Sequence, residues 1–199
     1  MQSSPRCLFL LWLALSAVTG ATAIAAESIG YFEAITSDPL PVVGQQYYTR
    51  HCFMYEKGVS DATNYWRGSL VSINTQVTLV SLDDRSMLLR LKSGETVKIE
   101  SEERHSRHSR RSMATVAHNL LTPQPVPVDK FDEAIASAIR SGTLKLGMTK
   151  EQVVMARGYP PGHKTPSLDS DRWCYWTSRY AEQTIAFSNG VLVRGRGIY

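Results

Sequence analysis

Period-two alternation of apolar and polar residues dominates the chain between residues 31 and 103. Met87, Leu89 and Leu91 alternate with polar and basic residues, and the alternation resumes at Val97 after a Ser-Gly turn. This pattern is typical of a half-buried β-hairpin. Runs rich in β-branched and aromatic residues predict further strands at 46–54, 68–73 and 76–82. About five short strands in this space are enough to close a small barrel, so we expect an all-β unit.

A helical period replaces this alternation after residue 129. Phe131, Ile135 and Ile139 fall on one stripe, which Asp129 can cap at the start and Gly142 can end. The spacing predicts an amphipathic helix whose apolar stripe faces the core.

A second helix is predicted over residues 150–157. Thr149 and Gln152 have the spacing of a capping box, in which a hydroxyl and an amide satisfy backbone donors that lack an intrahelical partner. Gly158 follows the last helical residue, where a left-handed cap favours glycine. All these local signals agree on the bounds of the helix.

Three antiparallel strands are predicted in the rest of the chain. Trp173 and Tyr175 alternate with more polar residues on the first, and the other two flank an Asn-Gly pair, the strongest short hairpin signal. A two-residue turn puts Phe187 opposite Leu192, a favourable cross-strand pair. Two helices followed by three strands predict a sheet with one face covered by helices.

The predicted fold class is therefore α+β, with two units behind a leader. The all-β unit covers residues 31–103, and the ααβββ unit covers residues 129–199. Residues 104–128 are charged at first and proline-rich later, which is typical of a linker. His105 and His108 in this linker have no third metal ligand nearby, and their neighbours are cationic. The basic cluster is expected to be solvated, with contact to anionic lipid headgroups as the alternative.

The first 26 residues have the layout of a secretory signal peptide. Arg6 precedes an apolar stretch from Cys7 to Ala17, and small residues lead to the expected cleavage site near Ala26. The apolar stretch is shorter than the roughly 20 residues that a membrane span needs. Cys7 lies at the start of this stretch, whereas a lipid-modified cysteine would lie after it. We therefore expect a mature chain that is periplasmic and not lipid-anchored.

The net charge does not by itself exclude any class of partner. The chain has 22 basic and 18 acidic residues, and loss of Arg6 with the leader leaves a formal net charge of +3. This mildly basic balance does not by itself indicate a nucleic-acid partner. No metal-ligand set and no cofactor-binding motif stands out in the sequence.

Cys52 and Cys174 are the cysteines of the predicted mature chain. Disulfides persist in an exported compartment, so a bridge between them is one alternative. The alternative that we favour is two separate thiols, because the cysteines fall in different predicted units.

The ααβββ unit carries a recognisable series of short motifs. In chain order they are Leu146-Gly147-Met148-Thr149, Gly158-Tyr159-Pro160, Trp173-Cys174-Tyr175 and Phe187-Ser188-Asn189-Gly190-Val191. Their order and spacing resemble the SmpA/OmlA family, also described as the BamE-like domain. The resemblance covers residues 140 to 197. Residues 64–77 of the all-β unit also resemble bacterial SH3-like modules, more loosely.

The BamE-like resemblance implies a position in the periplasm at the outer membrane and a supporting role in assembling outer-membrane proteins. Envelope proteins are therefore the expected partners. Two features depart from the family pattern, namely the absence of a lipid-anchor cysteine and the extra all-β unit. The SH3-like resemblance implies the alternative of a cell-wall or glycan ligand, for which Tyr65 and Trp66 are the aromatic candidates.

An enzyme needs a nucleophile with its base, a paired set of carboxylates, or a metal set, and none has convincing spacing here. The best candidate is Cys174 with His163 and Asp169 or Asp171, but a strand cysteine between core aromatics explains it better. We therefore expect a protein that is not an enzyme.

A binding surface is the more promising kind of site. Trp176 points away from the side of the strand that carries Trp173 and Tyr175. An apolar patch with a polar rim is typical of protein interaction sites. The candidate partner-binding residues are Tyr159, Pro160, Pro161, His163, Lys164 and Trp176. The alternative is a loop that packs on its own sheet.

Overall fold

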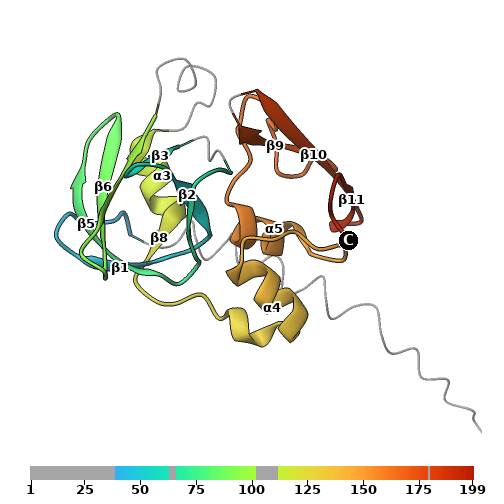
Figure 1. Cartoon of the computed structure of the whole chain (residues 1–199), viewed down its shortest axis with the longest axis horizontal. Coiled ribbons are helices and arrows are strands. Elements are labelled where there is room, and N and C mark those ends of the chain that lie inside the picture. The colour runs from blue at the N-terminus through green and yellow to red at the C-terminus, as the bar shows by residue number, and fades with distance from the viewer. Residues whose placement is uncertain (1–38, 63–65, 102–111, 179) are drawn as a thin grey trace, which may run out of the picture.

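The computed structural model describes residues 39–62, 66–101, 112–178 and 180–199. The predicted leader, Tyr65 and the two linker histidines lie outside these ranges. Figure 1 shows a β-rich part on the left and two helices with a three-stranded sheet on the right. The fold is α+β, in agreement with the sequence. Within the described ranges, no helix has the length and the apolar character to cross a membrane.

The β-rich part, here the first unit, extends to residue 122. Its main sheet is six-stranded, with the order β3-β7-β6-β5-β1-β8, and β2 and β4 form a separate pair. The elements are β1 (Gln46–Thr49), β2 (Phe53–Tyr55), β3 (Val59–Asp61), β4 (Ser69–Val71), β5 (Gln76–Leu82), β6 (Ser86–Leu91), β7 (Thr96–Glu100), α3 (Met113–Leu120) and β8 (Leu121–Thr122).

The hairpin predicted from the alternation is β6–β7. Leu89 lies opposite Val97 in the register, and Met87 lies opposite Ile99. All four side chains are buried in the core of the first unit, while the intervening positions face outward. The period-two pattern therefore identified both the hairpin and its buried face.

The closed barrel expected for this unit is not found. Among the described residues, β3 and β8 end the six-stranded sheet without pairing to each other, so the sheet stays open. The predicted strand 46–54 is divided into β1 and β2. Between them the backbone N–H groups of Arg50 and Cys52 donate outside the sheet, to the carbonyls of Leu120 and Met155.

Helix α3 replaces part of the predicted linker. Ser112 caps it by accepting a hydrogen bond from the Thr115 amide, and Met113, Ala117 and Leu120 are buried. These three residues join the apolar core of the first unit. Their spacing is helical, but the charged composition just upstream hid it. Residues 112–122 therefore belong to a packed unit and not to a linker.

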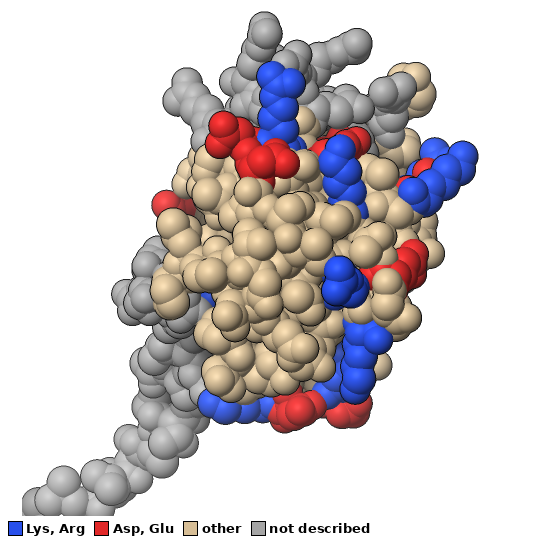
Figure 2. All heavy atoms as spheres, turned by 90° about the vertical axis from the view of Figure 1, so that its left-hand side faces the viewer, with Lys and Arg blue, Asp and Glu red and all other residues tan. Residues whose placement is uncertain are grey.

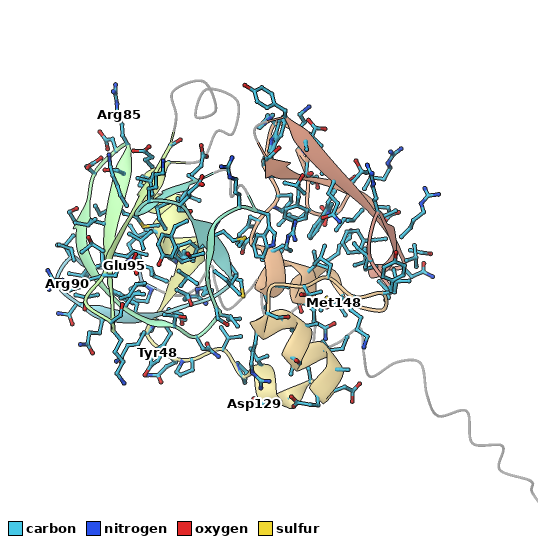
Figure 3. All side chains as sticks on the ribbon, viewed as in Figure 1. Tyr48, Arg85, Arg90, Glu95, Asp129 and Met148 are labelled. Atoms are coloured by element: carbon cyan, nitrogen blue, oxygen red, sulfur yellow. The ribbon has the colours of Figure 1, made fainter. Side chains whose placement is uncertain are left out.

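The second unit consists of two helices followed by three strands. Its elements are η1 (Val128–Lys130), α4 (Glu133–Arg140), α5 (Lys150–Arg157), β9 (Arg172–Ser178), β10 (Ala181–Ser188) and β11 (Val191–Gly195). Helix α4 starts later than predicted, with Asp132 as its N-cap residue, because Asp129 lies in the short η1 turn. The Asp129 carboxylate, which is labelled in Figure 3, instead pairs with Arg140 at the other end of the helix.

Helix α5 agrees closely with its prediction. The Thr149 side chain accepts from the Gln152 amide, and the Gln152 side chain accepts from the Thr149 amide, so both halves of the capping box form. Gly158 ends the helix with φ 71° and ψ −175°. This backbone conformation is essentially restricted to glycine.

The predicted three-stranded meander is also present. β9, β10 and β11 are antiparallel neighbours, and Phe187 lies opposite Leu192 as expected. Asn189 and Gly190 form the turn with φ values of 51° and 77°. Both values are positive, as this tight hairpin turn requires.

The two units share the hydrophobic core of the second unit, and the first unit also has a core of its own. Cys52 and Ile73 of the first unit are buried in the same cluster as Ile139 and Trp173 of the second. The Cys52 thiol donates to the Ile139 carbonyl at 3.1 Å and accepts from the Ile73 amide at 3.2 Å. The boundary between the units is thus a packed interface.

Candidate functional site

The three-stranded sheet has two chemically different faces. The core face carries Trp173, Tyr175, Ile185, Phe187 and Leu192, which are all buried. Alternation along the strands puts a second set of residues on the opposite side, here called the outer face. The outer face consists of Arg172, Cys174, Trp176, Glu182, Thr184, Ala186 and Arg194.

Trp176 is the large aromatic of this outer face, and it is half-buried. The His163 ring lies 6.3 Å from the Trp176 ring, centre to centre, at a tilt of 33°. The Lys164 ammonium lies 5.4 Å from the Trp176 ring centre, within cation–π range. The structure therefore brings together three of the predicted binding residues, and we call them the Trp176 cluster.

An ion pair fixes this cluster to the neighbouring strand. The Lys164 ammonium is 2.8 Å from a carboxylate oxygen of Glu182. The hydrogen bond between them, and after it their opposite charges, raises the pKa of Lys164 and lowers the pKa of Glu182. Glu182 lies opposite Trp176 in the β9–β10 register, so the ion pair and the indole occupy one end of the outer face.

The loop that carries His163 and Lys164 packs along β9. The Cys174 amide donates to the Thr165 hydroxyl at 3.0 Å, and Thr165 is buried. Pro160 and Pro161 are buried as well, so little of either proline is left for a partner. Pro160 and Pro161 therefore belong to the packed part of the loop, while His163 is half-buried and Lys164 is exposed beside Trp176.

Tyr159 is directed toward the first unit. Its ring and the His51 ring form a T-shaped pair, with 6.0 Å between the ring centroids and an interplanar angle of 78°. Both residues line a cavity of about 40 Å³ at the junction, together with Phe53, Asp61 and Asn119 among others. The cavity has room for only a few water molecules. Tyr159 is thus a residue of the junction between the units.

Both cysteines are free, and no disulfide joins them. Burial raises the pKa of the Cys52 thiol, which lies in the shared core. The Cys174 sulfur lies 3.3 Å from a Glu182 carboxylate oxygen. Burial first, and this carboxylate second, raise the pKa of Cys174. A raised pKa disfavours the thiolate form that a nucleophilic cysteine needs.

Trp66 lies in the interface between the units. The Arg157 guanidinium lies 4.1 Å from the Trp66 ring centre, and the Trp66 amide donates to the Trp176 carbonyl at 3.3 Å. Burial lowers the pKa of Arg157 to about 10. Trp66 is therefore engaged in packing, which conflicts with its expected place in an exposed glycan-binding groove.

Sequence reasoning missed Glu151, which lies in the first turn of α5. Only 7% of this residue is exposed, and its Oε1 atom has no hydrogen-bond partner. Burial raises the pKa of Glu151 to about 7. An acid in a first helical turn normally reads as an exposed group that stabilises the helix dipole, so the sequence gives no signal of this burial.

The described residues contain no group of three or more His, Cys, Asp or Glu side chains that could hold a metal ion.

The surface of the first unit differs from the outer face of the sheet, because its centre is largely uncharged in Figure 2. The segment before β1 exposes the apolar residues Leu40, Val42 and Val43.

Comparison of the chain with protein-family models, with curated proteins and with solved structures finds no match.

Proposed function

We propose that the protein is an exported, non-enzymatic module that binds another protein of the cell envelope through the outer face of its three-stranded sheet. The observation that carries this proposal is the Trp176 cluster. Its half-buried indole has a cation and a histidine ring at its border. An aromatic anchor with a polar rim is the arrangement that concentrates binding free energy in protein interfaces.

The order of elements in the second unit supports the same class of function. Two helices, three antiparallel strands, the Thr149 capping box and the Asn-Gly turn accompany the motifs that resemble the BamE-like family. By analogy, the partner is an envelope protein, and the role is to support outer-membrane or envelope assembly. Fold analogy alone does not fix a partner. The partner must therefore be tested at the outer face itself.

Two other functions are less well supported. A thiol enzyme needs an activated Cys174, and the carboxylate beside it acts in the opposite direction. A glycan-binding first unit needs an aromatic groove, and Trp66 stacks on Arg157 instead. If a Cys174→Ser variant lost activity but kept normal stability, the hypothesis of a thiol enzyme would be supported.

Position-specific crosslinking in living cells tests the proposed face. A photoreactive residue replaces Thr184, which is exposed on the outer face, or Thr96, which is exposed on β7 of the first unit. We expect a defined protein adduct from position 184 that is lost when Trp176→Ala is added. Adducts only from position 96, or from neither, contradict the outer face as the binding site.

The proposed compartment depends on the leader, which has its own test. We expect the mature protein to begin within a few residues of Glu27, since small residues precede this first acid. Mass spectrometry of the protein from the periplasmic fraction measures this N-terminus. A cytoplasmic protein that keeps its leader, or a retained Cys7 with acyl chains, contradicts the prediction.

A further inference from the structure

One row of residues crosses the outer face beyond the Trp176 cluster. Ala186 on the central strand lies opposite Arg172 on β9 and opposite Arg194 on β11. A register shift beside Phe187 accompanies this pairing, and it puts Arg194 on the same side as Arg172. Adjacent strands are about 4.8 Å apart, so the two arginine backbones flank Ala186 at roughly 10 Å from each other.

The side chains of both arginines are exposed. Within the described part of the chain, neither guanidinium has a hydrogen bond or an ion pair. Some other surface arginines are engaged, since Arg67 pairs with Glu56 at 3.0 Å and Arg140 pairs with Asp129. The row thus consists of two unpaired guanidinium groups with the small side chain of Ala186 between their strands.

The nearby acids are directed to other cations. The Glu182 carboxylate pairs with Lys164 at 2.8 Å, and an Asp171 carboxylate oxygen lies 3.9 Å from the Lys150 ammonium. The positive charge of the row is therefore available to a ligand. Guanidinium groups bind carboxylates in bidentate geometry, and a carboxylate above Ala186 is within reach of both.

We propose that Arg172 and Arg194 form a receptor for an acidic side chain of the protein partner, which lies along β10 and also contacts Trp176. This inference rests on the function proposed above and specifies the chemistry of the partner. Ala186 and Glu182 are four residues apart on β10, or about 13 Å along the strand. The partner segment therefore has an acid at one end of the face and an apolar side chain at the other.

An acidic peptide fits this face better than an anionic membrane does. Glu182 lies on the same outer face, and Asp169 and Asp171 are exposed just before β9. Asp169 forms no ion pair among the described residues, so its charge repels an extended plane of anionic headgroups, whereas a peptide acid can contact the arginine row alone. The experiment includes vesicles so that the two ligand classes are distinguished.

The test measures peptide binding by fluorescence anisotropy with the full mature chain. The probe is a fluorescein-labelled peptide with a short run of Asp residues next to a Phe, and its partner probe has Asn in place of Asp. We expect the wild-type protein to prefer the Asp peptide. The double variant Arg172→Glu, Arg194→Glu should weaken Asp-peptide binding about tenfold.

The control is the double variant Arg90→Glu, Lys92→Glu, which makes the same charge change on the exposed part of the first unit. It should bind the Asp peptide within about twofold of the wild type, because long-range charge effects are screened at physiological salt. Equal losses in both double variants, or no preference of the wild type for Asp over Asn, would overturn the proposal.

Two further arms separate this inference from the proposed function. Binding to phosphatidylglycerol vesicles should fall no further in the arginine double variant than in the charge-matched Arg90→Glu, Lys92→Glu control. A larger loss of vesicle binding, with peptide binding unchanged, would assign the row to lipid. If the adduct from position 184 survives in the arginine variant and is lost with Trp176→Ala, the binding face is supported and the acidic ligand is refuted. If peptide binding needs the arginines but no protein adduct forms, the receptor is supported and the protein partner is refuted.

Discussion

Burial of Glu151 makes the free energy of unfolding depend on pH. Its carboxyl group stays neutral in the folded state up to about pH 7, whereas an unfolded chain ionises it near its ordinary pKa of 4.5. Between these values the unfolded state binds fewer protons than the folded state. The free energy of unfolding therefore decreases as the pH rises from about 4.5 through about 7.

We predict that Glu151→Gln removes this decrease, because an amide does not ionise. Thermal unfolding from pH 4.5 to 8 measures the effect as the difference in Tm between variant and wild type. Glu133→Gln is the matched control, since Glu133 occupies the first turn of α4 with 85% of its side chain exposed. A Glu151→Gln profile parallel to that of the wild type would show that this carboxyl is not the titrating group.

The two tryptophans of β9 should respond differently to truncation. Trp173 is completely buried and packs on Phe187 at 4.7 Å between ring centroids, whereas Trp176 is half-buried under the loop. We expect Trp173→Ala to cost about 3–5 kcal/mol of stability, as a lost core aromatic does. Trp176→Ala should leave the protein folded and weaken partner capture by about 1–3 kcal/mol.

Urea unfolding measured beside the yield of the crosslinked adduct distinguishes these effects. The prediction fails if Trp176→Ala unfolds the protein or leaves the adduct yield unchanged. In that case the partner is to be sought on the first unit, for example near the exposed Leu40 and Val42.

At the scale of elements, α5 depends on the groups at its two ends. Thr149→Ala removes the hydroxyl that accepts from the Gln152 amide, which should cost about 1 kcal/mol. Asp132→Ala is the control, because Asp132 caps α4 without a side-chain hydrogen bond, and its loss should cost less. Chemical denaturation of both variants gives the comparison. Equal costs would show that the capping box contributes little.

The C-terminal end of α5 should tolerate substitution less well than its N-terminal end. Gly158 combines φ 71° with ψ −175°, a conformation in which any side chain is strained. We predict that Gly158→Val costs at least about 1–3 kcal/mol, more than Thr149→Ala. A smaller loss for the valine variant in the same denaturation series would mean that this backbone conformation relaxes easily.

The elements that could be predicted from the sequence are those with local determinants. The capping box, the Asn-Gly turn and the strand alternation each depend on contacts between residues close in the chain, and α5, β6–β7 and β9–β11 follow them. Two kinds of feature could not be predicted. Helix α3 has a helical stripe next to a charged run, and β3 pairs in parallel with β7 across a long separation in sequence.

The candidate site also contains features that the local sequence determines and features that it does not. The outward direction of Trp176 follows from alternation on one strand, and its contacts with His163 and Lys164 agree with the predicted patch. The inward direction of Tyr159 and Trp66 depends on packing between the two units, which no local pattern encodes. The arginine row depends on a register shift between β10 and β11 and is equally invisible in the sequence.

At the scale of the whole molecule, Gly142 lies where the second unit packs closely against Trp66 of the first unit. A Cβ atom at this position would lie 2.4 Å from the Trp66 ring, and the backbone has φ 68°. Gly142→Ala therefore adds a clash to the strain of a positive φ. We predict a loss of stability about 1–3 kcal/mol larger than that of Gly147→Ala, where φ is 90° but the space is open.

A double-mutant cycle measures the clash directly. Trp66→Ala creates the missing space, so the additional cost of Gly142→Ala should largely disappear in that background. Additive losses in the cycle would mean that the two units do not press against each other at this point. The Gly147→Ala variant in the Trp66→Ala background serves as the control, because its cost should not change.

The shared core also constrains the order in which the chain can fold. Cys52 and its acceptor at Ile139 are 87 residues apart, so the first unit cannot satisfy this buried thiol until α4 has emerged. A chain that is synthesised or exported from its N-terminus presents Cys52 and Ile73 uncovered throughout that interval. Contacts between residues so far apart in sequence also slow folding. We therefore expect an incomplete chain to be most vulnerable to proteolysis and misassociation before residue 140 is available, even though the folded protein buries the same residues.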